Sequence, residues 1–387
     1  MFDVLQPSSL CYPQRLANAH HCTYSSHFKV AIMPLQKRRI VIIGAGIFGT
    51  AMAYHLASPK TDVVVIESGP KPACGVTGRA FGWINTVHGV PGSESHALWR
   101  KAVSDYPALI QDLPQMSGFS RHGSLLWHAA TQETEQLFAT RQDAGEAVEL
   151  VDRPTISRLE PHLRHVPETA VYSADDIAID PIRLAGTLVK AAQTRGATMR
   201  FDETVTSIET MNGHVSGIRT SAGLIETDCV ILAAGPGTDM LAKQLGIDLG
   251  MVLSPALLLG YACESQFIRH ILDGPRVEVR QSLDKTVFIA KSWHADINDT
   301  PTVIGQRFLF LLADEFDLPS PLSLISAEIG NRPTFADGLP RLGFLCNVEG
   351  LYLATGHPGL ILAPYLARLA AREILHGEKP EFGSPSP

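Results

Sequence analysis

Arg39-Ile40-Val41-Ile42-Ile43-Gly44-Ala45-Gly46-Ile47-Phe48-Gly49 is the stretch that decides the fold of this chain. A run of β-branched apolar residues leads directly into the pattern G-x-G-x-x-G, and residues 50–56 continue with a helical pattern. A second apolar run, residues 63–66, then ends in Glu67. Strand, glycine turn, helix, strand and acidic residue in this order are the fingerprint of a βαβ unit that binds a dinucleotide.

Each position of the fingerprint has a physical role. Gly44 permits a tight turn, Gly46 lets the backbone approach a pyrophosphate, and Gly49 lets the helix pack closely on the strand. The N–H groups at the start of the helix attract the phosphate charge. Glu67 can accept protons from both ribose hydroxyls, and its charge disfavours the 2′-phosphate of NADP. A chance glycine-rich turn is the alternative interpretation.

Composition narrows the class of protein. The 387 residues suit two interleaved domains, and 45% hydrophobic with 18% charged residues is typical of a globular protein. The net charge of −7 without a dominant basic stripe argues against nucleic-acid binding, and no apolar run is long enough to span a bilayer. The six cysteines are scattered and the 15 histidines show no ligand spacing. We therefore expect a cytoplasmic protein with reduced thiols and no metal site.

The beginning of the chain differs from the rest. Residues 1–32 are mixed polar, with Arg15 and Lys29 as the only basic residues and no clear amphipathic basic face. Residues 33–39, by contrast, read like the start of a dinucleotide-binding protein. We expect residues 1–37 to be a disordered or dispensable extension, of which 1–32 can be removed without loss of folding.

The rest of the chain alternates between two kinds of pattern. Helices are expected at 97–113, where Pro107 introduces a kink or a break, at 131–144, and from Pro181 with Asp180 as the N-cap. Strands are expected at 198–201, 204–209, 214–220, 229–232 and 351–354, and a last helix ends near Leu375. Residues 251–310 contain short β-rich segments of antiparallel type. The pattern predicts a mixed α/β fold: a Rossmann-like domain (38–90, 172–248 and 333–387) with an inserted, mostly antiparallel sheet domain (91–171 and 249–332).

Six segments, in this order, carry a family resemblance. They are the fingerprint at 40–67, the small-residue loop 75–84, and the segments 178–183, 230–235, 332–340 and 356–364. Together they resemble the FAD-dependent amine and D-amino-acid oxidase family, which includes glycine oxidase, sarcosine oxidase and D-amino acid dehydrogenases. The resemblance implies the glutathione-reductase-type FAD fold and FAD rather than NAD as the dinucleotide.

The resemblance also implies which residues bind the cofactor. They are Gly44, Gly46, Ile47, Phe48, Gly49, Glu67, Ser68, Thr77, Arg79, Ala80, Phe81, Gly82, Trp83, Val205, Ala234, Gly235, Gly356, Gly359, Leu360 and Ile361. The amides of Gly359, Leu360 and Ile361 are placed to stabilise negative charge on the flavin N1 and C2 carbonyl. Thr77 and Arg79 are expected to reach the pyrophosphate. A surface charge for Arg79, core packing for Trp83 and a plain strand for Val205 are the alternatives.

For the substrate, the resemblance points first to Arg332. The arginine of the matching R-P segment holds the substrate carboxylate in this family, and a guanidinium can bind a carboxylate through two parallel hydrogen bonds. A structural ion pair with Asp337 is the alternative. Tyr261, expected in a strand facing the flavin, and His357, near the start of the last helix, are further catalytic candidates, with packing and capping as alternatives. His88 is a weaker candidate for the same pocket.

Two features depart from the family pattern. The loop at 356–359 is shorter than in glycine oxidase and lacks an arginine found there, which puts small glycine-like substrates in doubt. The covalent attachment pattern is absent, so FAD is expected to be non-covalent and Cys346 to be a buried thiol.

The implied activity is oxidation of the C–N bond of an amino acid or secondary amine. A hydride passes to flavin N5, an imine results, and the electrons go to oxygen, giving hydrogen peroxide, or to another acceptor. An FAD-dependent 2-hydroxy acid or polyol dehydrogenase and a non-catalytic flavoprotein subunit are the alternatives.

Overall fold

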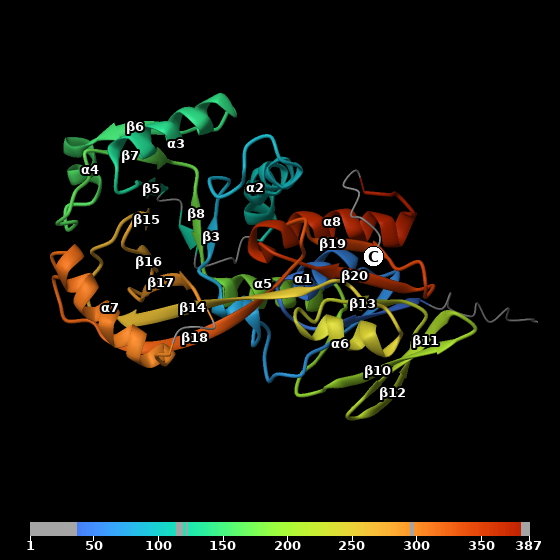
Figure 1. Cartoon of the computed structure of the whole chain (residues 1–387). Helices are drawn as coiled ribbons and strands as arrows, with labels where there is room; N and C mark the ends of the chain where they lie inside the picture. Colours follow the sequence, from blue (N-terminus) through green and yellow to red (C-terminus); the bar gives the residue numbers. More distant parts are fainter. Residues whose placement is uncertain (1–36, 114–118, 121–122, 295–297, 381–387) are drawn as a thin grey trace, which may run out of the picture. The chain divides into compact units, whose positions relative to one another are not determined.

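Two large β-sheets organise this protein, as the computed structural model shows (Figure 1). The structure describes residues 37–113, 119–120, 123–294 and 298–380. The predicted N-terminal extension therefore lies outside the described residues, except for Lys37. From Lys37 onward the chain forms one compact unit.

The first sheet has six strands in the order β19-β20-β13-β1-β2-β9. Their bounds are Arg341–Phe344 for β19, Leu351–Thr355 for β20, Val230–Leu232 for β13, Arg38–Ile43 for β1, Thr61–Ile66 for β2 and Thr198–Arg200 for β9. All neighbours are parallel except the edge pair β19–β20. The glycine-rich turn follows β1, so the fingerprint forms the βαβ unit that the sequence predicts.

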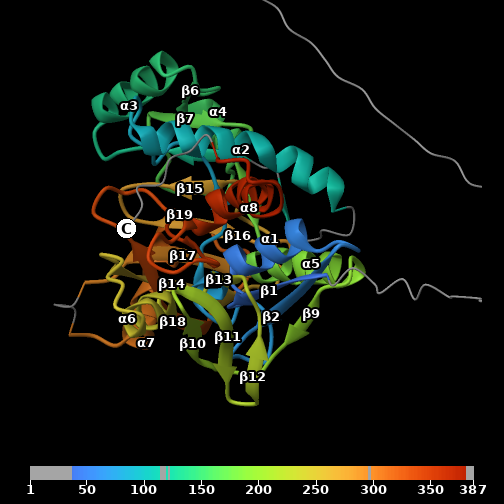
Figure 2. The ribbon, with the colours of Figure 1, turned by 90° about the vertical axis from the view of Figure 1, so that its right-hand side faces the viewer.

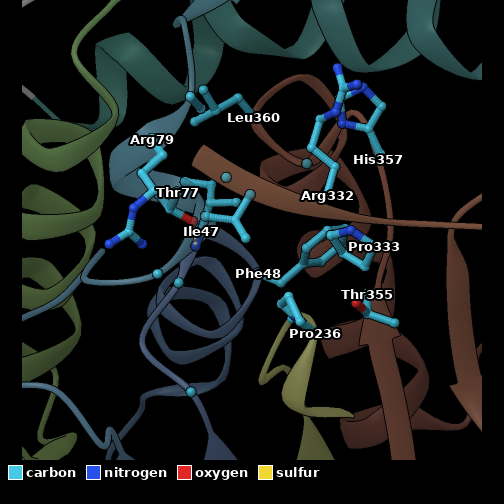
Figure 3. A pocket seen from close by; sticks show the side chains of 18 of the residues that line it. Ile47, Phe48, Thr77, Arg79, Pro236, Arg332, Pro333, Thr355, His357 and Leu360 are labelled. Atoms are coloured by element: carbon cyan, nitrogen blue, oxygen red, sulfur yellow. Dashed lines mark hydrogen bonds between the residues drawn. The ribbon is translucent and has the colours of Figure 1, made fainter. Parts of the chain in front are cut away.

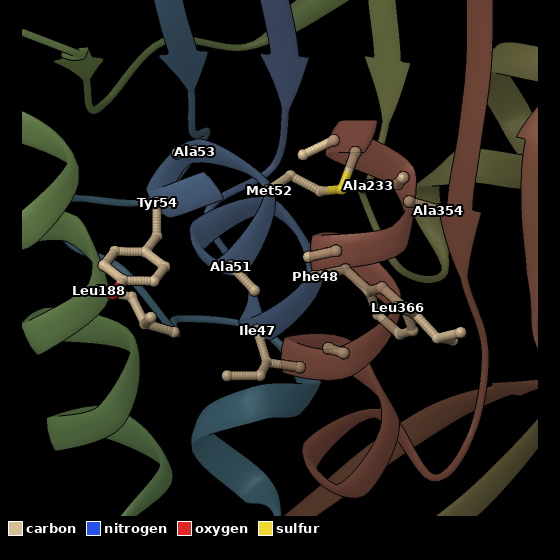
Figure 4. Close-up of a cluster of buried hydrophobic side chains, with 14 of the residues drawn as sticks. Ile47, Phe48, Ala51, Met52, Ala53, Tyr54, Leu188, Ala233, Ala354 and Leu366 are labelled. Atoms are coloured by element: carbon tan, nitrogen blue, oxygen red, sulfur yellow. The ribbon is translucent and has the colours of Figure 1, made fainter. Parts of the chain in front are cut away.

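Both faces of this sheet are covered, which explains its almost purely apolar strands. Ile40 and Ile42 of β1 pack under helices α1 (Ile47–Leu56), α5 (Pro181–Thr194) and α8 (Gly359–His376). Val41 and Ile43 pack against the antiparallel strands β10 (Val205–Met211), β11 (His214–Thr220) and β12 (Gly223–Glu226) on the opposite face (Figure 2). Figure 4 shows side chains of α1, including Phe48 and Met52, between Leu188 of α5 and Leu366 of α8.

The second sheet has eight strands in the order β18-β14-β17-β16-β15-β5-β7-β6. Their bounds are Ser323–Thr334 for β18, Val252–Ala262 for β14, Val287–Ser292 for β17, Glu278–Gln281 for β16, Ile271–Asp273 for β15, Ser124–Leu126 for β5, Thr169–Ser173 for β7 and Glu149–Asp152 for β6. Every neighbouring pair is antiparallel except β15 and β5. A third, small sheet joins β3 (Trp83–Ile84), β8 (Ile177–Ile179) and β4 (Phe119–Ser120).

The remaining helices are α2 (Glu94–Asp112), α3 (Thr131–Asp143), α4 (Arg153–Leu159), α6 (Gly237–Gln244), α7 (Pro301–Glu315) and the short 3₁₀ helix η1 (Val76–Arg79). Helix α2 continues through Pro107 without a break. Asp180 caps α5 as predicted, because its carboxylate accepts the amide protons of Ile182 and Arg183 at 2.9 and 3.1 Å.

The mixed α/β fold is confirmed, with one local correction. The segment 251–310 is not β-rich throughout, because α7 begins at Pro301, where the Thr300 side chain accepts the amide proton of Val303. The first sheet takes its strands from 38–66, 198–232 and 341–355, and the second from 124–173 and 252–334. The exact domain boundaries stay a prediction.

Candidate functional site

A cavity of about 780 Å³ lies at the carboxyl ends of the parallel strands. It is bordered by the turns after β1, β2, β13 and β20, and on its other side by β14, β16, β17 and β18. This is where ligands bind in open parallel sheets. Among the side chains labelled in Figure 3, Arg79 lies at one end of the view and Arg332 with His357 at the other.

The glycines of the fingerprint are required by close backbone contacts. Gly44 has φ +101°, and a Cβ there would lie 2.6 Å from the carbonyl oxygen of Ala233. A Cβ on Gly49 would lie 1.8 Å from the carbonyl oxygen of Gly44. Gly49 does not border the cavity, so it acts by letting α1 approach β1 rather than by contact with a ligand.

Glu67 is fixed at the end of β2 by hydrogen bonds from two backbone amides. Its Oε2 accepts the amide proton of Ala45 at 2.7 Å, and its Oε1 accepts that of Gly69 at 2.8 Å. A carboxylate has about four acceptor positions. Oε1 also accepts a hydrogen bond from the Ser68 hydroxyl at 3.3 Å, so Oε2 is the oxygen that keeps capacity to accept a hydrogen bond from a ribose hydroxyl.

Three helices begin at the cavity, and none has a side-chain cap on its N-cap residue. Their first residues, Ile47 of α1, Gly237 of α6 and Gly359 of α8, all border it. The amide proton of Ile47 is donated to Thr77 Oγ1 at 2.9 Å, so the hydroxyl proton of Thr77 stays available to a phosphate oxygen. The positive ends of these helices suit an anionic pyrophosphate and a flavin that becomes negative. The residues present therefore fit FAD.

The loop at 80–83 is held from behind by groups that the sequence did not reveal. Gly82 has φ +84°, and a Cβ there would lie 2.1 Å from the carbonyl oxygen of Ile179. Trp83 Nε1 donates to Asp176 Oδ2 at 2.7 Å, and Asp176 also accepts from two serine hydroxyls. Arg280, which is 3% exposed, donates to the Phe81 carbonyl oxygen, and its guanidinium stacks on the Phe81 ring.

Arg79 has a partner on the inserted sheet. Its Nε donates to Glu328 Oε2 at 2.8 Å, and its Nη1 donates to the Cys74 carbonyl oxygen at 3.0 Å. The guanidinium borders the cavity while making this ion pair, so the ion pair restricts its position there.

Arg332 reaches the cavity from β18 and is oriented by Ser254 on β14. Its Nε donates to the Ser254 carbonyl oxygen at 3.0 Å, and its Nη2 donates to Ser254 Oγ at 2.8 Å. Asp337 pairs instead with Arg341 at 3.0 Å, so the alternative of an Arg332–Asp337 ion pair is wrong. Burial and, to a lesser extent, the charge of Arg332 lower the pKa of His357 to about 4, which keeps this imidazole neutral.

Glu278 is a cavity residue that the sequence analysis missed. It lies on β16 and borders the cavity. Burial, and to a lesser extent the charge of Asp273, raise the pKa of its carboxyl to about 8, although Arg332 opposes the shift. Asp273 in turn lies 3.8 Å from His88 Nε2. No sequence motif marks Glu278, because only the pairing of distant strands brings it to the site.

Two expectations are corrected by the structure. Tyr261 is fully buried away from the cavity, and its hydroxyl donates to the Gly305 carbonyl oxygen of α7 at 2.9 Å. It shares the face of β14 that carries Leu257 and Leu259 into the core under α7. Cys346 is exposed rather than buried.

Apart from Gly49 and Tyr261, all residues proposed for the site from the sequence border the cavity. They are Gly44, Gly46, Ile47, Phe48, Glu67, Ser68, Thr77, Arg79, Ala80, Phe81, Gly82, Trp83, Val205, Ala234, Gly235, Gly356, Gly359, Leu360, Ile361, Arg332 and His357, together with His88. Their contacts with FAD and substrate, and the non-covalent attachment of FAD, stay predictions.

No helix in the described part of the chain is both long and apolar enough to cross a membrane. Within the same residues, no group of three or more His, Cys, Asp or Glu side chains could hold a metal ion.

Comparisons with known proteins agree with this geometry. Glycine oxidase of Pseudomonas aeruginosa is 28% identical over 357 residues, covering 88% of this chain and 96% of that protein. A D-amino acid dehydrogenase of Rhizobium johnstonii is 24% identical, covering 89% and 97%. The crystal structure of glycine oxidase from Bacillus cereus matches with a TM-score of 0.78 at 22% identity, covering 89% of this chain and 96% of that one, which supports the fold.

The family itself is shown by a match along most of the chain. A family model described as FAD dependent oxidoreductase (DAO) matches residues 39–373. This range contains the fingerprint, both large sheets and nearly all of α8. The chain therefore belongs to the DAO family of FAD-dependent oxidoreductases, with FAD as its cofactor.

Proposed function

We propose that this protein oxidises the C–N bond of an amino acid or secondary amine to an imine, which hydrolyses in water. The electrons then pass to oxygen, giving hydrogen peroxide, or to another acceptor. The observation that carries the proposal is Arg332, the guanidinium that borders the cavity from the inserted sheet.

Arg332 is suited to a substrate carboxylate. A guanidinium has five N–H donors, and Ser254 accepts two of them. Nη1 has no hydrogen-bond partner among the residues that the structure describes. The half-buried position strengthens an ion pair relative to one in water. A carboxylate held here is fixed in orientation, which is the main requirement for presenting the adjacent carbon to the flavin.

The proteins similar to this chain support an amino acid as substrate, since they are named glycine oxidase and D-amino acid dehydrogenase. When bound, FAD supplies an N5 atom that accepts a hydride from the substrate carbon. The amides of Gly359, Leu360 and Ile361 at the start of α8 face the cavity without a side-chain cap, and they favour negative charge beside them. His357 is neutral above about pH 5 and adds no second cation near Arg332.

The test is anaerobic mixing of the FAD-loaded protein with a substrate panel, while the visible absorbance of oxidised flavin is followed. The panel contains D- and L-amino acids, N-methyl amino acids, cyclic imino acids and 2-hydroxy acids. We expect bleaching by amines only, and readmission of air then shows whether oxygen is the acceptor. Bleaching by 2-hydroxy acids alone, or by dithionite alone, would refute the proposal in favour of a hydroxy acid dehydrogenase or a non-catalytic subunit.

A further inference from the structure

Glu278 is an acidic group inside the cavity whose position the proposed activity does not explain. The register of the second sheet places Leu258, Ala290 and Glu278 side by side on β14, β17 and β16, and all three border the cavity. The Glu278 carboxyl makes no hydrogen bond or ion pair with the described residues. A carboxyl removed from water normally has such a partner.

Glu278 and Arg332 lie at opposite ends of one open area of the sheet. Arg332 on β18 and Glu278 on β16 are three strand spacings apart, which is about 14 Å across the sheet. On β14, Arg332 lies level with Ser254 and Glu278 lies level with Leu258, so the two Cα atoms are also offset by four residues, or about 13 Å, along the strands. The cavity-lining residues between them include Ala256 and Ala290, whose side chains are small. The space between guanidinium and carboxyl is therefore open to a molecule that reaches both.

The charges near Glu278 favour a cation rather than a second anion. Asp273 adds another carboxyl close to it, and Arg332 is the positive group that acts on it most strongly. His357 is neutral at physiological pH. A substrate with two carboxylates would place the second one among acidic groups, whereas a positive group would stabilise the ionised form of Glu278.

The reacting nitrogen is a poor partner for this carboxyl. Amine oxidation needs an unprotonated nitrogen, because its lone pair forms the C=N bond of the imine. A carboxylate beside that nitrogen would stabilise the ammonium form and oppose the reaction. A positive group elsewhere in the substrate has no such conflict with the chemistry.

We propose that Glu278 pairs with a positively charged group in the side chain of the substrate, so that the site prefers basic amino acids to neutral and acidic ones. The inference rests on the proposed function, in which Arg332 binds the carboxylate of an amino acid. It names the class of that amino acid and assigns Glu278 as the residue that selects it.

The first test compares lysine, norleucine and glutamate, each as the D and L form, by the rate of anaerobic flavin bleaching. Lysine and norleucine differ only by the ε-amino group. We expect lysine to react at least about 30-fold faster than norleucine at low concentration, the lower range for a buried charge pair. Glu278→Gln should bring the ratio close to one, Glu278→Asp should restore part of it, and Glu149→Gln, an exposed glutamate of β6, should leave it unchanged.

The second test measures binding without turnover. 6-Aminohexanoate and hexanoate carry the same carboxylate and chain, and flavin difference spectra report their binding to the FAD-loaded protein. The amino compound should bind at least about 30-fold more tightly to the wild type and no more tightly than hexanoate to Glu278→Gln. Flavin content and melting temperature check that each variant is folded.

The outcomes separate the two proposals. If norleucine bleaches the flavin as fast as lysine, or if Glu278→Gln keeps the preference for lysine, the inference about Glu278 is wrong while amine oxidation stands. If only 2-hydroxy acids bleach the flavin, the proposed function fails and the inference fails with it.

Discussion

The affinity for positively charged ligands should depend steeply on pH, because Glu278 must lose its proton to pair with them. Burial holds the pKa of its carboxyl at about 8 when no ligand is bound. Below that pH the empty site contains the neutral acid, and part of the binding free energy is spent on ionising it. Since the ε-amine of 6-aminohexanoate stays protonated to about pH 10, only the protein titrates in this range.

The size of the pH effect on affinity follows from the fraction of Glu278 that is ionised at each pH. With a pKa of about 8, that fraction is about 0.01 at pH 6, 0.1 at pH 7 and 0.5 at pH 8, so affinity rises about 50-fold from pH 6 to 8 and less than twofold beyond. Four other groups face Glu278 from the surrounding elements: Arg332, Asp273, His88 and His357. Arg332 stays charged throughout. The pKa of His357 is about 4 and that of His88 is lowered by desolvation, so neither imidazole is protonated above pH 7.

The assay is a titration of the FAD-loaded protein with 6-aminohexanoate at several pH values, with hexanoate as the reference ligand. Asp273 lies 3.8 Å from His88 Nε2, and its own pKa is raised by burial, so the ratio of the two affinities is the quantity to follow. This ratio should rise with pH in the wild type and stay flat in Glu278→Gln. A flat ratio in the wild type between pH 6 and 8 would refute the reasoning.

Three further predictions test other parts of the structure. Arg332→Ala should raise KM for the substrate about 100-fold or more and leave FAD bound, as steady-state kinetics and flavin absorbance would report; an unchanged KM contradicts the carboxylate role. Gly49→Ala forces a Cβ to within 1.8 Å of the Gly44 carbonyl oxygen and should lower the melting temperature and the flavin content, whereas Gly186→Ala, with open space around it in α5, should be neutral or slightly stabilising. Burial raises the folded-state pKa of Asp176 to about 6, so the folded protein favours the protonated carboxyl. The protonated form therefore adds about 3 kcal/mol to the free energy of unfolding at low pH, and this stabilisation is lost as the pH rises through 6. The melting temperature of Asp176→Asn should therefore rise relative to the wild type between pH 4 and 8, and a pH-independent difference would contradict this.

The dinucleotide end of the site could be predicted from the sequence because its determinants are local. Gly44, Gly46 and Gly49 lie within six residues, and Glu67 follows at the end of the next strand. Close backbone contacts at Gly44 and Gly49 admit only glycine, so the physical requirement is visible as a residue type.

The substrate end could not be predicted to the same extent, because strand pairing decides it. Tyr261 was expected to face the flavin, but the alternation of side chains along β14 places it with Leu257 and Leu259 on the face that packs into the core. Glu278 and Arg280 have no motif around them, and they reach the site because β16 joins β17 in the second sheet. A single charged residue in a short strand gives no sign that it faces a cavity.

The helix α7 was missed for a different reason. Residues 301–315 begin with a proline and contain Gly305, and the preceding segment is rich in short strands. The cap at Thr300 is the signal that marks this helix, together with Pro301 in its first turn.

The strand order of the first sheet has a consequence for synthesis of the protein. Strand β1 lies between β2, which follows it closely in the chain, and β13, which begins only at Val230. At a translation rate of 5–20 residues per second, one edge of β1 waits on the order of ten seconds for its second neighbour on the ribosome. The amides of α8 that complete the cavity emerge later still, after residue 358. The complete cavity, and with it the whole cofactor site, can therefore form only after the start of α8 has been synthesised.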